Sequence, residues 1–374
     1  MNGILQQDVN QETFVLNLGP QHPATHGVLR VKLVMDGEYI VEAEPVLGYI
    51  HRMHEKMGEN RTWAQFLPNC GRIDYLSALS YNHGYVAAVE RAAGIEVPER
   101  AEYLRVITVE LNRISSHLLW FGAFVLDLGG FTPLLYAFDD REQILDLLES
   151  VTGSRLTYCY FRFGGVYNDI DDAFVPGARE FIKRLRKRLP MYHALVTKNI
   201  ILIKRLKDIG PISQDMIRRY GATGPVARGS GINFDVRKHE PYSVYPEFDF
   251  DIPVYQAGDS MSRYMVRMDE MEQSMRIIEQ ALDKLPDGPV MAAKPPKIIK
   301  PEKGDYYHAV EAARGSFGVR LVSDGTNSAY RLKLRSPTFS NLSLFGEAAK
   351  GMLLPDALAL MGSLDLVIPE IDRG

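Results

Sequence analysis

PERAEYLRVITVELNRISSHLLWFGAFV, residues 98–125, is the stretch that decides the fold. Pro98 and Glu99 are typical of a helix start, and nothing up to Val125 interrupts the pattern that follows. Apolar side chains recur every three or four residues, which is the spacing of one face of an α-helix. These apolar positions are Leu104, Ile107, Val109, Leu111, Ile114 and Leu118. The sequence therefore predicts one long helix here, around which other helices can pack.

Further helices are expected on both sides of this segment. Helical spacing of apolar residues marks four more stretches, and in one of them five methionines repeat every three or four residues. Methionine commonly fills gaps in packed cores, so we interpret that stripe as helix core. The expected helices are Tyr75–Gly94, Asp139 or Asp140 to Val151, 176–208 with an interruption near Pro190, and Ser260–Leu285, whose stripe is Met261, Met265, Met268, Met271 and Met275.

Strands are expected at the two ends of the chain. Alternating apolar residues with an Asp36-Gly37 turn predict a hairpin near the N-terminus, and a second set follows a connector rich in Pro and Lys. We predict an α+β fold in three regions: an N-terminal antiparallel β region (1–48), a helical core (49–285), and a connector with a β region and a tail (286–374). The expected strands are Thr13–Asn17, Val28–Met35, Tyr39–Ala43, Tyr306–Arg314, Gly318–Ser323 and Ala329–Arg335.

Composition excludes several classes of function. The chain has 374 residues and a net charge of −4, which gives no field that favours nucleic acid. Its two cysteines, Cys70 and Cys159, cannot form a four-thiolate metal cage or hold an iron–sulfur cluster. The start lacks the pattern of a signal peptide, and no window approaches 18 uninterrupted apolar residues, so we expect no membrane span.

Two loops and one short motif suggest sites and have plain alternatives. The loop Gly19–Gly27 carries His22 and His26, which could be a metal pair or part of an ordinary hairpin loop. His51-Arg52-Met53-His54-Glu55 resembles a zinc-protease motif, but Gly58 stands where the second histidine is required. The glycine-rich stretch 221–231 lacks the lysine of a phosphate loop, so we interpret it as a close-packed connector rather than a nucleotide site.

Several charged residues need an explanation within a packed fold. Glu110, Arg113 and His117 share one helix face, where internal ion pairing is favoured over catalysis. Asp127 stands alone in an apolar run, and a buried carboxylate there would require a cationic or hydrogen-bonding partner. The basic residues of 183–207 form a solvated face or dock to an acidic partner or anionic headgroups.

Seven motifs, taken together and in order, resemble the D subunit of respiratory complex I, which is the quinone-site subunit. They span nearly the whole chain, which makes the resemblance specific. They are GPQHPATHG (19–27), LGYIHRMHEK (47–56), GRIDY (71–75), ELNRISSHLLW (110–120), FRFGGV (161–166), TGPVARGSGI (223–232) and SLDLVIPEIDR (363–373).

A second resemblance is to the large subunits of nickel–iron hydrogenases, which implies a hydrogenase-large-subunit-like fold. Glu311-Ala312-Ala313-Arg314-Gly315 is similar to their EAPRG segment. Their four metal-binding cysteines correspond to positions that hold other residues here. Nickel–iron chemistry needs soft thiolates, so hydrogenase activity is excluded and no metal is expected in this chain. The four positions are Asp74, Ser77, Val367 and Glu370.

The resemblance to the complex I family implies a quinone site in the former metal pocket. It assigns His26 and Tyr75 as headgroup ligands, with His22 beside them, and Asp127 as the carboxylate that partners His26. Arg52 corresponds to an arginine beside the terminal iron–sulfur cluster of a neighbouring subunit. Many relatives have histidine at the position of Thr157, also close to that cluster.

The same resemblance implies a place in a larger assembly, with quinone as substrate. The expected function is quinone reduction within a proton-translocating NADH-quinone oxidoreductase, and a ferredoxin-dependent or other donor-dependent relative is the alternative. A scaffold without chemistry is a third hypothesis. Expected partners are the iron–sulfur B subunit, the C and I subunits, and the membrane-embedded H subunit, on the cytoplasmic side of the bacterial inner membrane.

Overall fold

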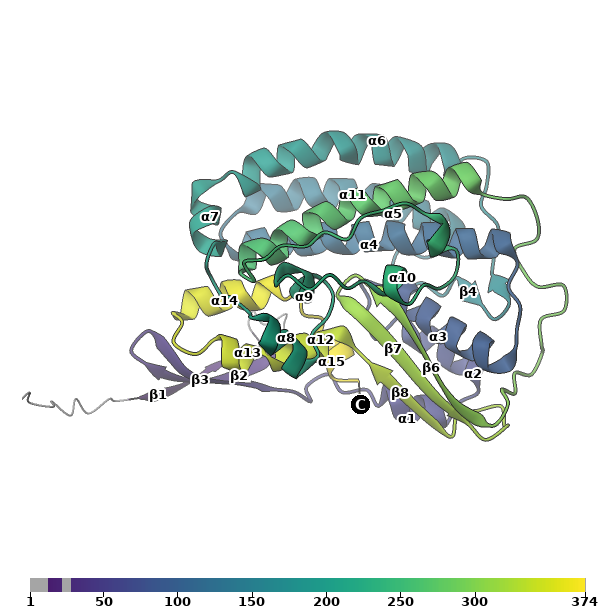
Figure 1. Cartoon of the computed structure of the whole chain (residues 1–374), viewed down its shortest axis with the longest axis horizontal. Coiled ribbons are helices and arrows are strands. Elements are labelled where there is room, and N and C mark those ends of the chain that lie inside the picture. The colour runs from purple at the N-terminus through teal and green to yellow at the C-terminus, as the bar shows by residue number, and fades with distance from the viewer. Residues whose placement is uncertain (1–12, 22–27, 374) are drawn as a thin grey trace, which may run out of the picture.

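The computed structural model describes residues 13–21 and 28–373. Four long helices lie side by side in it and form one layer (Figure 1). The helices run alongside one another and contact each other in the pairs α4–α5, α5–α6, α11–α4 and α11–α6. Their bounds are α4 Glu99–Asp127, α5 Phe131–Thr152, α6 Phe174–Tyr192 and α11 Ser260–Lys284. The predicted long helix at 98–125 is thereby confirmed, as is the predicted helix at 260–285.

Helix α5 begins about eight residues before the position expected from sequence. Its first two turns expose large apolar side chains, among them Phe131 and Leu135 with 59% and 56% exposure. A helix is recognised in a sequence by apolar residues that recur on one face only. Here apolar residues lie on both the buried and the exposed face, so that pattern is hidden. The prediction that began at Asp139 or Asp140 therefore missed a real part of the helix.

The basic segment 176–208 divides a few residues after the predicted break at Pro190. Pro190 is accommodated inside α6, which continues to Tyr192 and passes into a π-helical turn, His193–Thr197. A new helix, α7, begins after Asn199, whose side chain accepts a hydrogen bond from the Ile201 amide. The exposed arginines pair with neighbouring helices; Arg186, for example, contacts Glu272 and Glu279 on α11.

Two three-stranded antiparallel sheets lie on the same side of the helical layer (Figure 1). In the first, Leu29, Val31, Leu33 and Met35 alternate inward with at most 2% exposure, as the period of a strand requires. In the second, β6 and β7 form a hairpin whose two-residue tip ends in Arg314. The strands are β1 Phe14–Leu18, β2 Arg30–Asp36, β3 Tyr39–Val46, β6 Gly304–Ala312, β7 Gly315–Ser323 and β8 Arg331–Arg335.

Short helices and a two-stranded ribbon connect these layers. The ribbon pairs β4 Phe161–Arg162 with β5 Gly165–Val166. The helices are α1 His54–Glu59, α2 Trp63–Cys70, α3 Ala78–Ala93, α7 Ile200–Leu206, α8 Gln214–Tyr220, α9 Pro225–Gly229, α10 Val236–His239, the 3₁₀ turn Tyr245–Glu247, α12 Pro337–Ser343, α13 Phe345–Ala348, α14 Leu354–Ser363 and α15 Ile368–Ile371. The predicted α+β class is confirmed.

Two apolar clusters hold the elements together. The larger one joins the long helices to α2, α3 and the β6–β8 sheet, and it contains Met268, Met271 and Met275 of the methionine stripe, each at most 2% exposed. The interpretation of that stripe as helix core is confirmed. The smaller cluster packs β2 and β3 against α8, α9 and the C-terminal helices. The C-terminal tail is thereby fixed between the N-terminal sheet and the helical layer.

The glycine-rich stretch 221–231 brings α9 into direct contact with the tip of the β6–β7 hairpin. A Cβ atom on Gly224 would lie 2.5 Å from both the Arg314 carbonyl oxygen and the Gly315 Cα. The reverse approach is as close, since a Cβ on Gly315 would lie 2.6 Å from Thr223 Oγ1. The interpretation of this stretch as a close-packed connector is confirmed.

We predict that Gly224→Ala destabilises the protein by about 2–3 kcal/mol, because the new methyl must displace backbone atoms of the hairpin tip. Gly221→Ala is the control for the positive φ. Gly221 has nearly the same φ, +64° against +69°, but its ψ is +33° against −148° for Gly224, and it has no atom within 4 Å of the added carbon. The measurement is the urea midpoint of both variants, and an equal shift in the two would show that the close approach is unimportant.

Candidate functional site

The four positions that correspond to hydrogenase cysteines meet in the interior. Asp74 and Ser77 lie just before α3, while Val367 and Glu370 lie at the start of and within α15; all four are at most 2% exposed. Two contacts bring the pairs together. The Tyr81 hydroxyl of α3 donates a hydrogen bond to Glu370, and the negative charge of Asp74 acts on the Glu370 carboxyl. Segments almost 300 residues apart therefore form one polar pocket.

The Asp74 carboxylate occupies one side of this pocket. It accepts hydrogen bonds from the Leu76 and Ser77 amides at 3.0 and 3.1 Å, and it pairs with Arg314 Nη1 at 2.8 Å. Burial raises the pKa of Asp74, and the Arg314 charge opposes that shift. The short loop after α2 thus fixes the carboxylate in the interior through its own backbone.

Arg314 connects the two halves of the pocket from the tip of the β6–β7 hairpin. Besides Asp74, its guanidinium contacts Asp365 Oδ1 at 3.4 Å and Ser116 Oγ of α4 at 3.2 Å. The side chain is completely buried, and these partners replace the water that Nη1 and Nη2 would otherwise require, whereas Nε has no partner among the described residues. We call Asp74, Ser77, Arg314, Asp365 and Glu370 the polar socket.

The remaining socket residues are also hydrogen-bonded. Glu370 Oε1 accepts a hydrogen bond from the Thr338 amide at 3.0 Å. Burial, and to a smaller extent the nearby Asp74 charge, raises the pKa of Glu370 well above its usual value. The Ser77 hydroxyl donates to Ser80 Oγ at 3.0 Å and accepts from the Ala313 amide at 3.4 Å. Within residues 13–21 and 28–373, no cluster of His, Cys, Asp or Glu suits a metal ion.

Tyr75 lies at the rim of the polar socket. Its neighbours in sequence, Asp74 and Leu76, are buried, whereas Tyr75 is 38% exposed. The charges of Arg314, Asp74 and Asp365 all act on its hydroxyl. Burial of the inner part of the ring is the largest effect and raises the pKa of Tyr75, so the phenol is protonated at neutral pH. The sequence-predicted phenol therefore lies beside the polar socket and remains accessible from outside.

Asp127 differs from the sequence expectation. It is the last residue of α4 and is exposed, so the interpretation of it as a buried carboxylate is wrong. The neighbouring residues explain the error, since Leu126 is also exposed and Phe131 lies outward on α5, so that the apolar run lies partly on the surface. Ser116, which contacts Arg314, is eleven residues earlier on the same helix, about 16 Å of helix rise away. His22 and His26 lie outside the residues that the structure describes.

The two residues assigned to a partner's cluster lie in separate loops. Arg52 is exposed in a loop tied to the C-terminal tail: the Gly48 and Ile50 amides donate to Asp372 Oδ2 at 2.8 and 3.0 Å. Thr157 is half-buried and adopts φ +51°. The next carbonyl, of Tyr158, accepts a hydrogen bond from Asn82 of α3 at 2.6 Å and lies against Gly71.

A network of buried ion pairs continues behind the socket, and sequence reasoning found only part of it. The expected pairing within α4 is confirmed by Arg113 Nε and Glu110 at 3.1 Å, while His117 contacts Glu270 of α11 at 2.9 Å. Arg228 joins Glu270 at 2.5 Å and Glu311 at 2.8 Å. Charged residues inside otherwise apolar or glycine-rich segments were the available signal for these partners.

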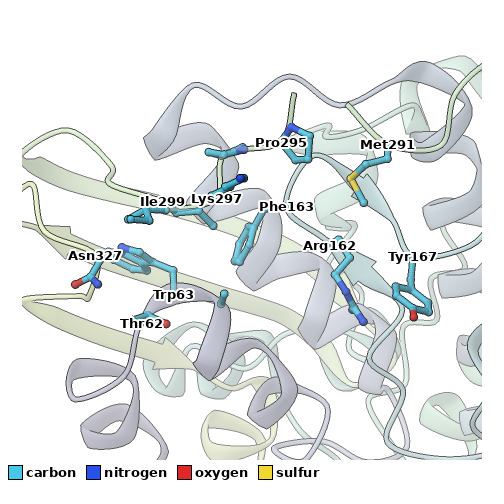
Figure 2. Close-up of a pocket in the computed structure, with 13 residues that line it drawn as sticks. Thr62, Trp63, Arg162, Phe163, Tyr167, Met291, Pro295, Lys297, Ile299 and Asn327 are labelled. Carbon is cyan, nitrogen blue, oxygen red and sulfur yellow. The ribbon is translucent and has the colours of Figure 1, made fainter. Parts of the chain in front are cut away.

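An apolar pocket of about 410 Å³ lies apart from this site (Figure 2). Trp63 and Phe163 form its floor, and Lys297 and Ile299 come from the Pro/Lys connector. Among the candidate residues that the structure describes, none lines it. In the described part of the chain, no helix combines the length and hydropathy that crossing a bilayer requires.

Comparison with known proteins identifies the family of this chain. The family model described as respiratory-chain NADH dehydrogenase, 49 Kd subunit, matches residues 127–303 and 296–373. The NADH-quinone oxidoreductase D subunit of Desulfotalea psychrophila is 78% identical over 97% of both chains. The D 2 subunit of Opitutus terrae is 68% identical over 97% of this chain and 91% of its own length, and the D subunit of Syntrophobacter fumaroxidans is 61% identical over 98% of both. The chain belongs to the D-subunit family of the NADH-quinone oxidoreductases, which are oxidoreductase complexes.

Proposed function

We propose that this chain forms the quinone-headgroup site of a proton-translocating NADH-quinone oxidoreductase. The observation that carries the proposal is Tyr75 at the rim of a buried polar socket, at the place where hydrogenase-like proteins would bind metal. The socket offers carboxyls, a hydroxyl and a guanidinium instead of thiolates. Such groups hold and orient protons, and they lack the soft thiolates of a nickel–iron centre.

The phenol of Tyr75 donates a hydrogen bond to one ring oxygen of the quinone and then a proton. Reduction adds two electrons and two protons, and each electron makes the ring oxygens more basic. Because the pKa of Tyr75 is raised, the phenol holds its proton until the ring oxygen has gained charge. The Arg314 charge behind it stabilises the phenolate that remains and thereby lowers the barrier to transfer.

His26 supplies the second proton in this proposal, with His22 beside it and Asp127 as its carboxylate partner. A nearby carboxylate favours the imidazolium form and so makes His26 the easier proton source. The proton deficit left at the 19–27 loop and Asp127 would then pass toward membrane subunits.

Electrons reach the site from an iron–sulfur cluster in a partner, the B subunit. The chain itself has two cysteines, Cys70 buried and Cys159 half-buried. Arg52, which is exposed, would lie beside that cluster, and a fixed cation there raises its potential. Thr157 takes the position where many relatives have histidine, so that proton-coupled behaviour of the cluster is expected to be weaker here.

The remaining assignments concern the assembly. The C and I subunits and the membrane-embedded H subunit are the further partners, and the complex lies on the cytoplasmic side of the inner membrane with this chain as a peripheral part. The relatives are named NADH-quinone oxidoreductase subunits, which favours NADH over ferredoxin as the electron donor for this chain. The quinone is a ubiquinone or a menaquinone.

We predict that Tyr75→Phe lowers quinone reduction by the assembled complex about 100-fold, because the ring oxygen loses its proton donor. NADH oxidation with ferricyanide, which accepts electrons before the quinone site, should be unchanged. Tyr167→Phe is the control, since Tyr167 is an exposed tyrosine in the pocket of Figure 2. Wild-type quinone turnover in Tyr75→Phe would overturn the assignment, whereas loss of the assembled complex would favour a scaffold role.

A second prediction concerns the pH profile of Asp127→Asn. Without the carboxylate, the pKa of the His26 imidazolium falls. As the pH is raised, the imidazolium that can donate a proton therefore disappears at a lower pH than in the wild type. The alkaline limb of quinone reduction should therefore move down by about one pH unit. Asp146→Asn, an exposed carboxylate on α5, should leave the profile in place. An unshifted alkaline limb in Asp127→Asn would remove this residue from the proposed proton source.

A further inference from the structure

Several buried polar atoms between the polar socket and the ion-pair network have no protein partner. His117 Nδ1, Asp365 Oδ2, and Nε and Nη2 of Arg267 are all inaccessible, and none has a hydrogen-bond partner in the described chain. Such atoms are rare in folded proteins, because burying a polar group without a hydrogen-bond partner is unfavourable. Four of them in one region require an explanation.

These atoms lie close to one another and come from three different elements. Arg267 Nε of α11 is 3.7 Å from Asp365 Oδ2, beyond hydrogen-bond distance but within reach of a shared neighbour. His117 of α4 follows Ser116, which contacts Arg314, and the charge of Arg267 acts on the His117 ring. Other bonds fix each side chain: Arg267 Nη1 donates to the Arg263 and Ser363 carbonyls, both at 3.0 Å.

The hydrogen-bonding roles of the four atoms can be deduced. Burial alone would raise the pKa of Glu270, but the Arg228 guanidinium that pairs with it, the hydrogen bond from His117 and the Arg113 charge together hold that pKa below its usual value. The ionised carboxylate accepts from His117 Nε2 at 2.9 Å. Burial lowers the pKa of His117, so the ring is neutral and Nδ1 is an acceptor. The unpartnered atoms are therefore two acceptors, His117 Nδ1 and Asp365 Oδ2, and two N–H donors of Arg267.

Two donors and two acceptors are the complement of one water molecule. An anion would be repelled by the Asp365 carboxylate and the Nδ1 lone pair, and a cation would be repelled by Arg267. A neutral molecule that both donates and accepts is the ligand that remains. We propose that an ordered water binds between His117, Asp365 and Arg267 and joins the polar socket to the Glu270–Arg228 network.

The water makes His117 a positioning residue for the site at Tyr75, a consequence that rests on the proposed function. It holds the Asp365 carboxylate, which contacts Arg314, and Arg314 is the cation behind the Tyr75 phenol. Without the water, Asp365 is free to turn toward Arg267 and away from Arg314. The phenolate left after proton transfer then has weaker stabilisation.

The direct test is a structure of the intact complex at a resolution that shows ordered solvent. We expect a density peak within hydrogen-bond distance of His117 Nδ1, Asp365 Oδ2 and Arg267. Direct contact between Arg267 and Asp365 with no peak would overturn the proposal. This observation does not depend on quinone chemistry, so it stands or falls separately from the Tyr75→Phe experiment.

Two variants of His117 separate the water from the Glu270 contact. His117→Asn places an amide oxygen where Nδ1 was and loses the reach to Glu270, whereas His117→Gln keeps a donor toward Glu270 and loses the acceptor toward the water. We expect kcat for quinone reduction to fall about tenfold in His117→Gln with KM within twofold, and to change less than threefold in His117→Asn.

The control is His83, another buried neutral histidine, which packs between Phe161 and Tyr242 away from the socket. His83→Asn and His83→Gln should leave the ratio of kcat to KM unchanged even where they reduce stability. A fall in kcat confined to His117→Asn would assign the effect to the Glu270 contact. An equal fall in kcat in both His117 variants would assign it to packing, and either result would overturn the role of the water.

Discussion

The ion pairs of Arg314 are the interaction on which the rest of the site depends. A guanidinium with no exposure is tolerable only where carboxylates and hydroxyls replace its water, and here Asp74, Asp365 and Ser116 do so. These partners come from the loop before α3, the C-terminal tail and α4. One cation therefore fixes three distant segments, and a hairpin tip that would ordinarily be exposed is held inside the molecule.

This constraint explains how a buried polar pocket keeps its shape. A polar cavity inside a protein must be filled by groups that bind one another, as thiolates and metal ions do in a metalloprotein. Charged hydrogen bonds take that role here, since Glu370 is bonded by Tyr81 and the Thr338 amide while Asp74 is bonded by its own loop. The partly exposed Tyr75 then lies above a rigid, charged base rather than in a flexible loop.

The sequence predicted the long helices, both β regions and the positions that meet in the socket, because those features are local or belong to collinear motifs. It failed where burial depends on tertiary context. Asp127 was expected to be buried because its neighbours are apolar, yet the end of α4 is exposed. The predicted start of α5 was too late because Phe131 and Leu135 are exposed, which hides the helical period of its first turns. The pairing of Arg228 with Glu270 and Glu311 joins distant segments, and no spacing rule reports such a contact.

The polar socket is proposed as the base above which the ring of a quinone binds. The most direct measurement is a structure of the intact complex with a bound short-chain quinone. We expect one ring oxygen within hydrogen-bond distance of the Tyr75 hydroxyl, with Arg314 behind that hydroxyl. A headgroup seated in the Trp63 pocket of Figure 2, or anywhere else out of reach of Tyr75, would contradict it.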